Sequence, residues 1–290
     1  MNQTDISVFE QLEQELAALR IELPSEGRSV TVTDFGARAD SNFCNTEAFN
    51  QALMYCRREK AEKLIIPKGV YRFKECSQNA HLILDDMENF TLDGQGSELI
   101  FESLSSYLSI CRSSRILVRD LILDWNWEKA PLSSVGVVSE AAEDGSYIEC
   151  VFPAYEEIPE DMTFSIVGPF DPCRYTPGCP GGMEFRPYQN EHVKKSGDEK
   201  TDAQMQELVR ELSNVFLPRQ EKTAANRLRF YTSDPDFTRR HFHVGNCFNF
   251  RHYEYDILTI PIQDTRDCTL DNVVIYSSPG SGFVGNGDIH

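Results

Sequence analysis

The sequence predicts a mainly β fold built from stacked coils, a β-solenoid, and three observations lead to this prediction. One amphipathic helix near the N-terminus is followed almost entirely by short strand-like segments. Three of these segments repeat the same spacing of apolar residues. A long stretch of different texture separates the second repeat from the third. Short strands repeated at a period of about 20 to 30 residues are typical of solenoids, in which each coil buries its inner face by stacking.

The helix is predicted from Thr46 to about Arg58, with Asn45 or Thr46 as its N-cap. Its apolar face, at helical spacing, consists of Ala48, Phe49, Ala52, Leu53 and Cys56. The open end of a solenoid exposes core side chains and unpaired backbone groups. We therefore expect this helix to cap the first coil.

The three repeats share apolar positions separated by six and then two residues. The triplets are Leu84, Phe90 and Leu92; Ile110, Ile116 and Val118; and Ile262, Cys268 and Leu270. Residues i and i+2 of a strand face the same side, so the last two members of each triplet are expected to face the core. Each triplet is followed by an Asp or Asn near a turn, at Asp93, Asp120 and Asn272. The repeats alone leave an ordinary β-sandwich open as the alternative.

An inserted α+β domain is predicted from about Glu128 to Gly245. An Asp-Gly turn at Asp144–Gly145 predicts a β-hairpin, and "NRLRFYTSD", 226–234, predicts a strand. A helix is predicted between them from the apolar positions Met205, Leu208, Val209, Leu212 and Phe216. The predicted organisation is an N-terminal amphipathic helix at 1–28, a cap and first coils at 29–127, the insert at 128–245, and continuing coils at 246–290. The N-terminal helix presents Val8, Phe9, Leu12, Leu16 and Leu19 and is expected to dock on another surface.

Charge and cysteine content restrict the function. Lys and Arg number 28 against 46 Asp and Glu, giving a net charge of -18. This charge argues against binding to nucleic acid or to an anionic membrane surface. The N-terminus has neither the basic region nor the apolar run of a signal peptide, and no segment has the length of a membrane span. With nine cysteines, an odd number, we expect reduced thiols in the cytoplasm; in an oxidising compartment Cys173 and Cys179 would be suited to a disulfide.

A resemblance to a known family refines the fold. The segment "VTDFGARAD…NTEAFNQAL…LIIPKGVY" resembles the N-terminal signature of the right-handed parallel β-helix superfamily of pectate lyases and polygalacturonases. The matching residues are Asp34, Phe35, Gly36, Ala37, Asn45, Thr46, Ala48, Phe49, Ala52, Ile66, Pro67, Gly69 and Tyr71. The resemblance implies a right-handed parallel β-helix with an N-terminal helical cap. It covers about 40 residues.

A narrower resemblance concerns the end of the chain. The segment "FRHYEYDILTIPIQDTRDCTLDNVVIYSSPGSGFVGNGD" is similar to bacterial β-helix glycosidases that include exo-acting α-1,3-galactosidases. Such hydrolases need two facing carboxyl groups, and in these families the acids lie on central coils. The sequence stops shortly after its third recognisable coil, at "GSGFVGNGDIH". We therefore expect a fragment whose C-terminal coils and catalytic carboxylates are missing.

Candidate substrate-binding residues lie near two coil ends. Asp124 ends a strand beside Trp125 and Trp127, and Trp rings stack on the apolar faces of sugars. The Trp residues are as well explained by packing between the insert and the coils. Arg251 and His252 could hold sugar hydroxyls or a carboxylate, although ion pairs of Arg251 with nearby acids explain it equally well.

Three further groups of polar residues bear on the prediction of a site. The "GNGDIH" segment places Asn286 and Asp288 in a predicted loop on the next coil, where Asp288 is a weak catalytic candidate and Asn286 a substrate-binding one. The adjacent acids Asp85 and Asp86 are expected to make a turn. His241, His243, Cys247 and His252 match no common zinc spacing, and no cofactor motif occurs, so neither metal nor cofactor is expected.

The sequence therefore predicts a carbohydrate-active protein of the glycoside hydrolase type, with an oligo- or polysaccharide as its partner. One alternative is a polysaccharide lyase, which would need a calcium-binding acidic cluster and a base. The other is a non-catalytic β-helix that binds glycans or has a structural role. The substrate sugar and the oligomeric state are left open.

Overall fold

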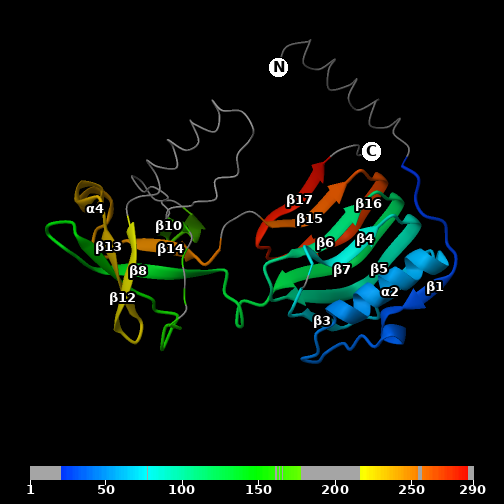
Figure 1. The fold of residues 1–290 in the computed structure, drawn as a ribbon, viewed down its shortest axis with the longest axis horizontal. Helices are drawn as coiled ribbons and strands as arrows, with labels where there is room; N and C mark the ends of the chain where they lie inside the picture. The colour runs from blue at the N-terminus through cyan, green and yellow to red at the C-terminus, as the bar shows by residue number, and fades with distance from the viewer. Residues whose placement is uncertain are drawn as a thin grey trace, which may run out of the picture. The chain divides into compact units, whose positions relative to one another are not determined.

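The computed structural model describes residues 21–286 except 77, 161, 163, 165, 178–215 and 254–256, and the side chains of 176–177 and 216–219 are also not described. The chain divides into two compact units (Figure 1): unit 1 is Met1–Ala130 with Tyr255–His290, and unit 2 is Pro131–Glu254. Strands dominate the described residues, which confirms the mainly β prediction. No helix in these ranges is long and apolar enough to cross a membrane. The predicted N-terminal helix lies outside the described residues.

Unit 1 begins with β1 (Ser29–Thr31), the short 3-10 helix η1 (Val32–Phe35) and α2 (Thr46–Glu59). The helix prediction is confirmed, and the buried residues of α2 are the predicted apolar face. Asn45 occupies the N-cap position, but its side chain makes no capping hydrogen bond. Its amide instead donates to the carbonyl oxygens of Arg38, Phe43 and Arg72, so this fully buried residue ties the loop before α2 to β3 (Val70–Phe73).

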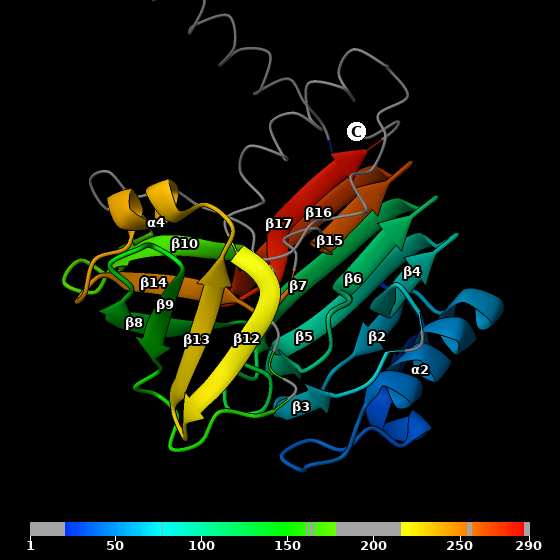
Figure 2. The same cartoon turned by 60° about the vertical axis from the view of Figure 1, so that its left-hand side comes forward.

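Two parallel sheets follow α2 and make up the rest of unit 1 (Figure 2). Sheet A has the order β1, β2 (Lys63–Ile65), β5 (Glu88–Phe101), β7 (Ser114–Trp125) and β16 (Arg266–Ile275), and β3 (Val70–Phe73) also pairs with β5. Sheet B has the order β17 (Gly280–Asn286), β15 (Ile257–Gln263), β6 (Ser106–Cys111) and β4 (Ala80–Asp85). Each strand therefore pairs with the strand at the same position of a neighbouring repeat.

The register shows that the three apolar triplets are structurally equivalent. Leu84 and Ile262 both pair with Ile110, Phe90 and Cys268 with Ile116, and Leu92 and Leu270 with Val118. The turns between the two sheets are equivalent as well, because Asp86, Arg112 and Asp264 all adopt positive φ angles. The predicted repeats thus lie side by side as successive layers of unit 1.

Aromatic side chains fill the interior of these layers. The rings of Phe73 and Phe101 stack at 4.9 Å, and those of Phe101 and Tyr107 stack at 3.9 Å. His81 packs on the Phe101 ring and is fully buried. Its Nδ1 lies 3.2 Å from Thr46 Oγ1 and its Nε2 lies 2.9 Å from Ser103 Oγ. Burial lowers the pKa of His81 to about 4.

Unit 2 is built on an antiparallel sheet, sheet C. Its order is β11 (Thr176–Pro177), β10 (Ile166–Asp171), β14 (Cys247–Arg251), β8 (Ser133–Ala141), β9 (Tyr147–Val151), β13 (Arg227–Thr232) and β12 (Phe216–Ala224). One short helix, α4 (Pro235–His241), has Asp234 as its N-cap, and the Asp234 carboxylate accepts the Phe237 N–H at 2.8 Å. A core of aromatic and aliphatic side chains, including Phe152, Phe164, Phe230 and Phe250, covers one face of the sheet.

Two strand predictions in unit 2 are confirmed, and one residue was assigned wrongly. The β8–β9 hairpin turns at Asp144–Gly145, and β13 covers the predicted strand. Phe216, predicted as the last residue of a helix face, is the first residue of β12, because backbone pairing with β13 decides its conformation. The rest of that predicted helix lies outside the described residues.

Gly145 carries a prediction about stability. Its φ is +76°, and a Cβ there would collide with the Pro235 carbonyl oxygen. Gly145→Ala is expected to lower the free energy of unfolding of unit 2 by about 1–3 kcal/mol. Hydrogen exchange of the β8 and β9 amides measures this change. Gly245→Ala is the matched control, because its φ is +91° with no atom near the added methyl. Equal effects of the two substitutions would show that the Pro235 contact is unimportant.

Candidate functional site

The outer face of sheet A carries the candidate functional site. On β5 and β7, Phe101 and Trp125 are buried, so Ile100 and Asp124, which alternate with them, face outward. Arg72 pairs with Ile100, and Ile100 with Asp124. The next position of this row is Tyr276, because β16 pairs Ile275 with Leu123 and the Tyr276 N–H continues to the Leu123 carbonyl at 3.0 Å. A row of outward side chains thus crosses four strands.

A second row lies at the carboxyl ends of the same strands. The Glu102 N–H donates to the Phe73 carbonyl and the Asn126 N–H to the Phe101 carbonyl, both at 2.9 Å, so the ladder continues past β5 and β7. The Asn126 amide donates to the Glu102 carboxylate at 2.9 Å. We use the name outer-face site for the polar and aromatic side chains of both rows together with the neighbouring Trp127 indole. It consists of Arg72, Glu102, Asp124, Asn126, Trp127 and Tyr276.

A cleft of about 640 Å³ opens over part of this site. Its lining residues are Asp40, Ser41, Asn42, Val70, Arg72, Lys74, Glu102, Asn126, Glu128 and Lys129. Three cationic and three anionic side chains are among these residues, so the cleft offers both hydrogen-bond donors and acceptors. Asp40 is engaged in the fold, since its carboxylate accepts the Val70 N–H at 3.0 Å. The cleft is suited to a ligand rich in hydroxyl groups.

The structure places both predicted residues of the "LILDWNW" segment in the outer-face site. One oxygen of Asp124 accepts the Trp125 N–H at 2.8 Å, which fixes the orientation of the carboxylate. The Trp127 ring is 46% exposed, and its indole N–H donates to Ser277 Oγ at 3.0 Å. The Tyr276 ring is 69% exposed. Two accessible aromatic rings therefore flank a carboxylate, and aromatic rings supply the apolar surface on which sugar rings stack.

Arg251 and His252, the second predicted pair, belong to unit 2. Arg251 is the last residue of β14. The nearby acidic residues that were the alternative ion-pair partners of Arg251 lie outside the described residues. His252 Nε2 lies 2.8 Å from Ser134 Oγ, which lies 2.6 Å from the Tyr155 hydroxyl. The His252 ring also packs 5.2 Å from Phe164. These contacts give His252 partners within unit 2.

The last predicted pair is only partly described. Asn286 was predicted in a loop, but it is the last residue of β17, because parallel pairing with Gln263 of β15 draws the segment into sheet B. Its carbonyl accepts the Asp264 N–H at 3.2 Å. Asp288, the weak catalytic candidate, lies outside the described residues.

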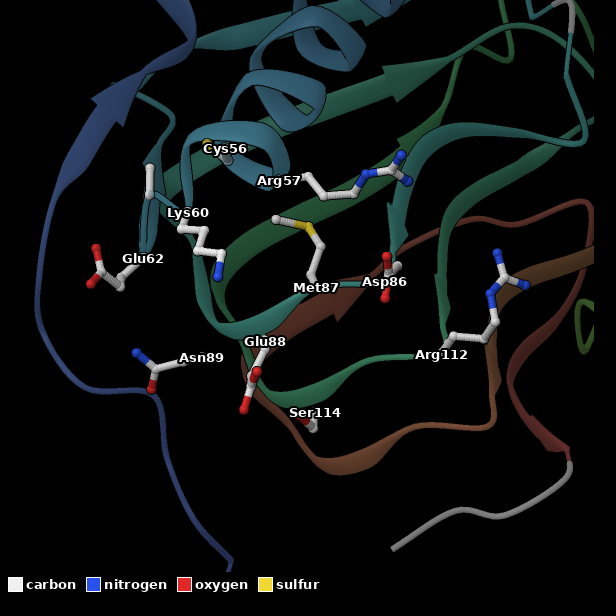
Figure 3. Close-up of a pocket in the computed structure, with 11 residues that line it drawn as sticks. Cys56, Arg57, Lys60, Glu62, Asp86, Met87, Glu88, Asn89, Arg112 and Ser114 are labelled. Atoms are coloured by element: carbon white, nitrogen blue, oxygen red, sulfur yellow. The ribbon is translucent and has the colours of Figure 1, made fainter.

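A second pocket, of about 620 Å³, lies at the turns between sheets B and A (Figure 3). Its rim combines Arg57, Lys60 and Arg112 with Glu62, Asp86 and Glu88, over Cys56 and Met87. The Asp85 carboxylate forms an ion pair with Arg112, lies 3.7 Å from Arg57, and accepts the Cys111 thiol at 3.2 Å. Asp86 has the positive φ of a tight turn. These contacts confirm the structural reading of the paired acids.

The chemistry of the second pocket favours the outer-face site as the candidate. Burial raises the pKa of Cys56, which lines this pocket, to about 12, and this leaves its thiol un-ionised. No aromatic side chain is among the residues that line either this pocket or the cleft, but the outer-face site adds the exposed Trp127 and Tyr276 outside the cleft. Across the described residues, no group of three or more His, Cys, Asp or Glu side chains is arranged to hold a metal ion.

Four residues of the outer-face site were missed from the sequence: Arg72, Glu102, Asn126 and Tyr276. One signal was available for Tyr276, because it follows Asp124 by the same 152 residues that separate the second and third triplets. Arg72, Glu102 and Asn126 have no motif of their own. They become neighbours only through the strand register.

Comparison with known proteins gives relatives of low identity. No protein-family model matches the chain. An α-1,3-galactosidase A of Shewanella woodyi is 23% identical over 274 residues, which cover 89% of this chain and 41% of that protein. An α-1,3-galactosidase B of Bacteroides thetaiotaomicron is 22% identical over 275 residues, covering 88% and 41%. One from Phocaeicola vulgatus is 27% identical over 157 residues, covering 47% and 26%. The chain thus spans about 41% of the length of the first two relatives.

Proposed function

We propose that this chain is part of a glycoside hydrolase acting on galactosides, and that the outer-face site contacts the sugar. The observation that carries the proposal is the outward row Arg72, Ile100, Asp124 and Tyr276 across neighbouring strands, with the exposed Trp127 beside it. A guanidinium and a carboxylate hold hydroxyl groups from two sides, while the rings cover a sugar face. The relatives named α-1,3-galactosidase support the same class of reaction and suggest the linkage.

The fold belongs to the same proposal. We propose that unit 1 is a right-handed parallel β-helix and that unit 2 is a domain inserted between its coils. The parallel pairing of equivalent repeats, with α2 packed at one end, supports this architecture. A cytoplasmic location is proposed on the free thiols, since all eight cysteines among the described residues are unpaired.

The charge of the cleft favours a hydrolase of neutral glycans over a lyase. Arg72, Lys74 and Lys129 are offset by Asp40, Glu102 and Glu128 in the cleft, and Asp124, outside the cleft lining, adds a negative charge in the same outward row as Arg72. A uronate polymer would be repelled by this balance, and lyase chemistry would also call for a base beside a calcium-binding cluster. A neutral oligosaccharide meets no such repulsion.

The catalytic carboxylate pair is proposed to be supplied by sequence outside this chain. The relatives' greater length supports this, because more than half of each lies outside the matched region. A non-catalytic glycan-binding role is the second candidate, and the same outer-face site would serve it. An intact-mass measurement of the native gene product separates the two, because a mass well above 33.1 kDa supports the hydrolase.

Binding of an α-1,3-linked digalactoside tests the role of the outer-face site. Trp127→Ala and Tyr276→Ala are each expected to raise the Kd about three- to tenfold, the effect of losing one stacking ring. Titration calorimetry measures the Kd. Tyr175→Ala is the control, because Tyr175 is an 82% exposed tyrosine of unit 2. Unchanged affinity in both site variants would exclude this face as the sugar-binding surface.

A further inference from the structure

Two cysteines of unit 2, Cys173 and Cys247, are far apart in sequence but come to the same end of sheet C. Strands β10 and β14 lie side by side and antiparallel (Figure 2), and Pro169 pairs with Phe248. The next position of this register sets Phe170 opposite Cys247, the first residue of β14. Cys173 follows in the turn directly after β10. The register therefore brings this turn to the beginning of β14.

The turn between β10 and β11 is folded against the end of its own strand. The Asp171 carboxylate accepts the Cys173 N–H at 2.9 Å and the Arg174 N–H at 3.1 Å. The ring centroids of Tyr175 and Phe170 lie 6.5 Å apart, in an edge-to-face arrangement. These contacts hold Cys173 close to the strand that neighbours β14.

The electrostatic environment of Cys247 agrees with this placement. Burial contributes most to raising the pKa of the Cys247 thiol, and negative charges at Cys173 and Asp171 raise this pKa further. The charge of one thiolate affects another group only when the two are close, because solvent screens charges over longer distances. Cys173 is therefore a near neighbour of Cys247.

The two thiols differ in access to solvent. Among the cysteines of the described residues, all of which are free, only Cys173 is exposed, and Cys247 is half-buried. Thiol–disulfide exchange needs an accessible thiolate for the first attack and a second thiol within reach to complete the reaction. Cys173 is suited to the first role and Cys247 to the second.

We propose that Cys173 and Cys247 form a reversible disulfide when the protein meets an oxidising thiol pool. The Cys173 thiolate attacks one sulfur of a low-molecular-weight disulfide such as oxidised glutathione, and one glutathione thiolate leaves. The Cys247 thiolate then attacks the Cys173 sulfur, which forms the protein S–S bond and releases the second glutathione. The protein loses two electrons and two protons, and the oxidised glutathione gains them. This proposal does not depend on the proposed function.

The disulfide changes the local stability of unit 2. It closes a loop of the chain that contains β12, β13 and α4. Because the bond limits how far β10 and β14 can separate, exchange of their amide hydrogens is expected to slow about tenfold on oxidation. The thiol pool around the protein thus controls how readily this part of sheet C opens.

Peptide mapping of the native 290-residue chain tests the proposal. The reduced protein is incubated with oxidised glutathione, the remaining thiols are blocked by alkylation, and tryptic peptides are sequenced by tandem mass spectrometry. The expected result is a cross-link between Cys173 and Cys247, with the loss of two of the nine thiols. The map is made on the wild type, so it does not depend on the folding of any variant.

Two variants assign the roles of the thiols. Cys247→Ser is expected to stop the reaction at the mixed disulfide, with glutathione left on Cys173, because the second thiol is missing. Cys268→Ser is the matched control, since Cys268 is also half-buried but belongs to unit 1. The control is expected to form the cross-link in the same yield as the wild type.

The alternative outcomes are distinguishable. Trypsin cleaves after Arg174 and so separates Cys173 from Cys179, which lies outside the described residues. A cross-link between Cys173 and Cys179 overturns the proposal. Wild-type protein that keeps all nine thiols, or that stops at the mixed disulfide, also overturns it. A disulfide-linked dimer on a non-reducing gel, in place of the cross-linked monomer, has the same meaning.

Discussion

Phe101→Ala is expected to lower the free energy of unfolding of unit 1 by about 3–5 kcal/mol, the cost of emptying a packed aromatic site. Phe101 is fully buried and stacks on Phe73 and Tyr107, at 4.9 and 3.9 Å. Neighbouring strands of a sheet cannot close the gap, because their spacing is fixed by backbone hydrogen bonds. Denaturant unfolding followed by tryptophan fluorescence measures the change, since both tryptophans, Trp125 and Trp127, lie in unit 1.

Leu104→Ala is the control for this prediction. Leu104 lies in the turn directly after β5 and is 48% exposed, so its truncation is expected to change stability by no more than about 0.5 kcal/mol. A loss below about 1 kcal/mol for Phe101→Ala would mean that the aromatic stack is not a main part of the hydrophobic core of unit 1.

Acidification is expected to destabilise unit 1 through His81. The unfolded chain protonates this imidazole near pH 6.5, whereas burial in the folded protein lowers its pKa to about 4. Between these two pKa values the imidazole is protonated in the unfolded state and neutral in the folded state. The free energy of unfolding therefore falls as the pH drops from about 6.5 to about 4. The shift corresponds to a loss of up to about 3 kcal/mol.

His81→Gln isolates this contribution from the titration of carboxylates. Glutamine retains groups that can bond to Thr46 and Ser103 but does not titrate. The free energies of unfolding of wild type and variant are measured by tryptophan fluorescence at pH 7 and pH 4. On going from pH 7 to pH 4, the wild type is expected to lose about 3 kcal/mol more than the variant. Parallel pH profiles of the two proteins would show that His81 is not buried in its neutral form.

Only part of the outer-face site could be predicted from the sequence. Asp124 and Trp127 were recognised because a carboxylate beside tryptophans is a local pattern. Arg72 and Glu102 lie in different repeats from Asp124 and Trp127, and only pairing across β3, β5 and β7 makes these residues neighbours. His252 is the opposite case, because its local sequence pattern suggested a substrate-binding residue. In the structure its side chain contacts Ser134, which in turn contacts Tyr155, within unit 2.

The sequence by itself determined the elements that depend on local chemistry and on period. It predicted the apolar face of α2, the Asp144–Gly145 turn and the equivalence of the three triplets. Each of these follows from helical spacing, turn residues or strand alternation, which are properties of short segments. The tertiary structure alone decided the strand conformation of Phe216 and Asn286 and the assembly of the outer-face site. Each of these depends on backbone pairing between segments distant in sequence, and residue type does not specify which distant strand will supply a partner.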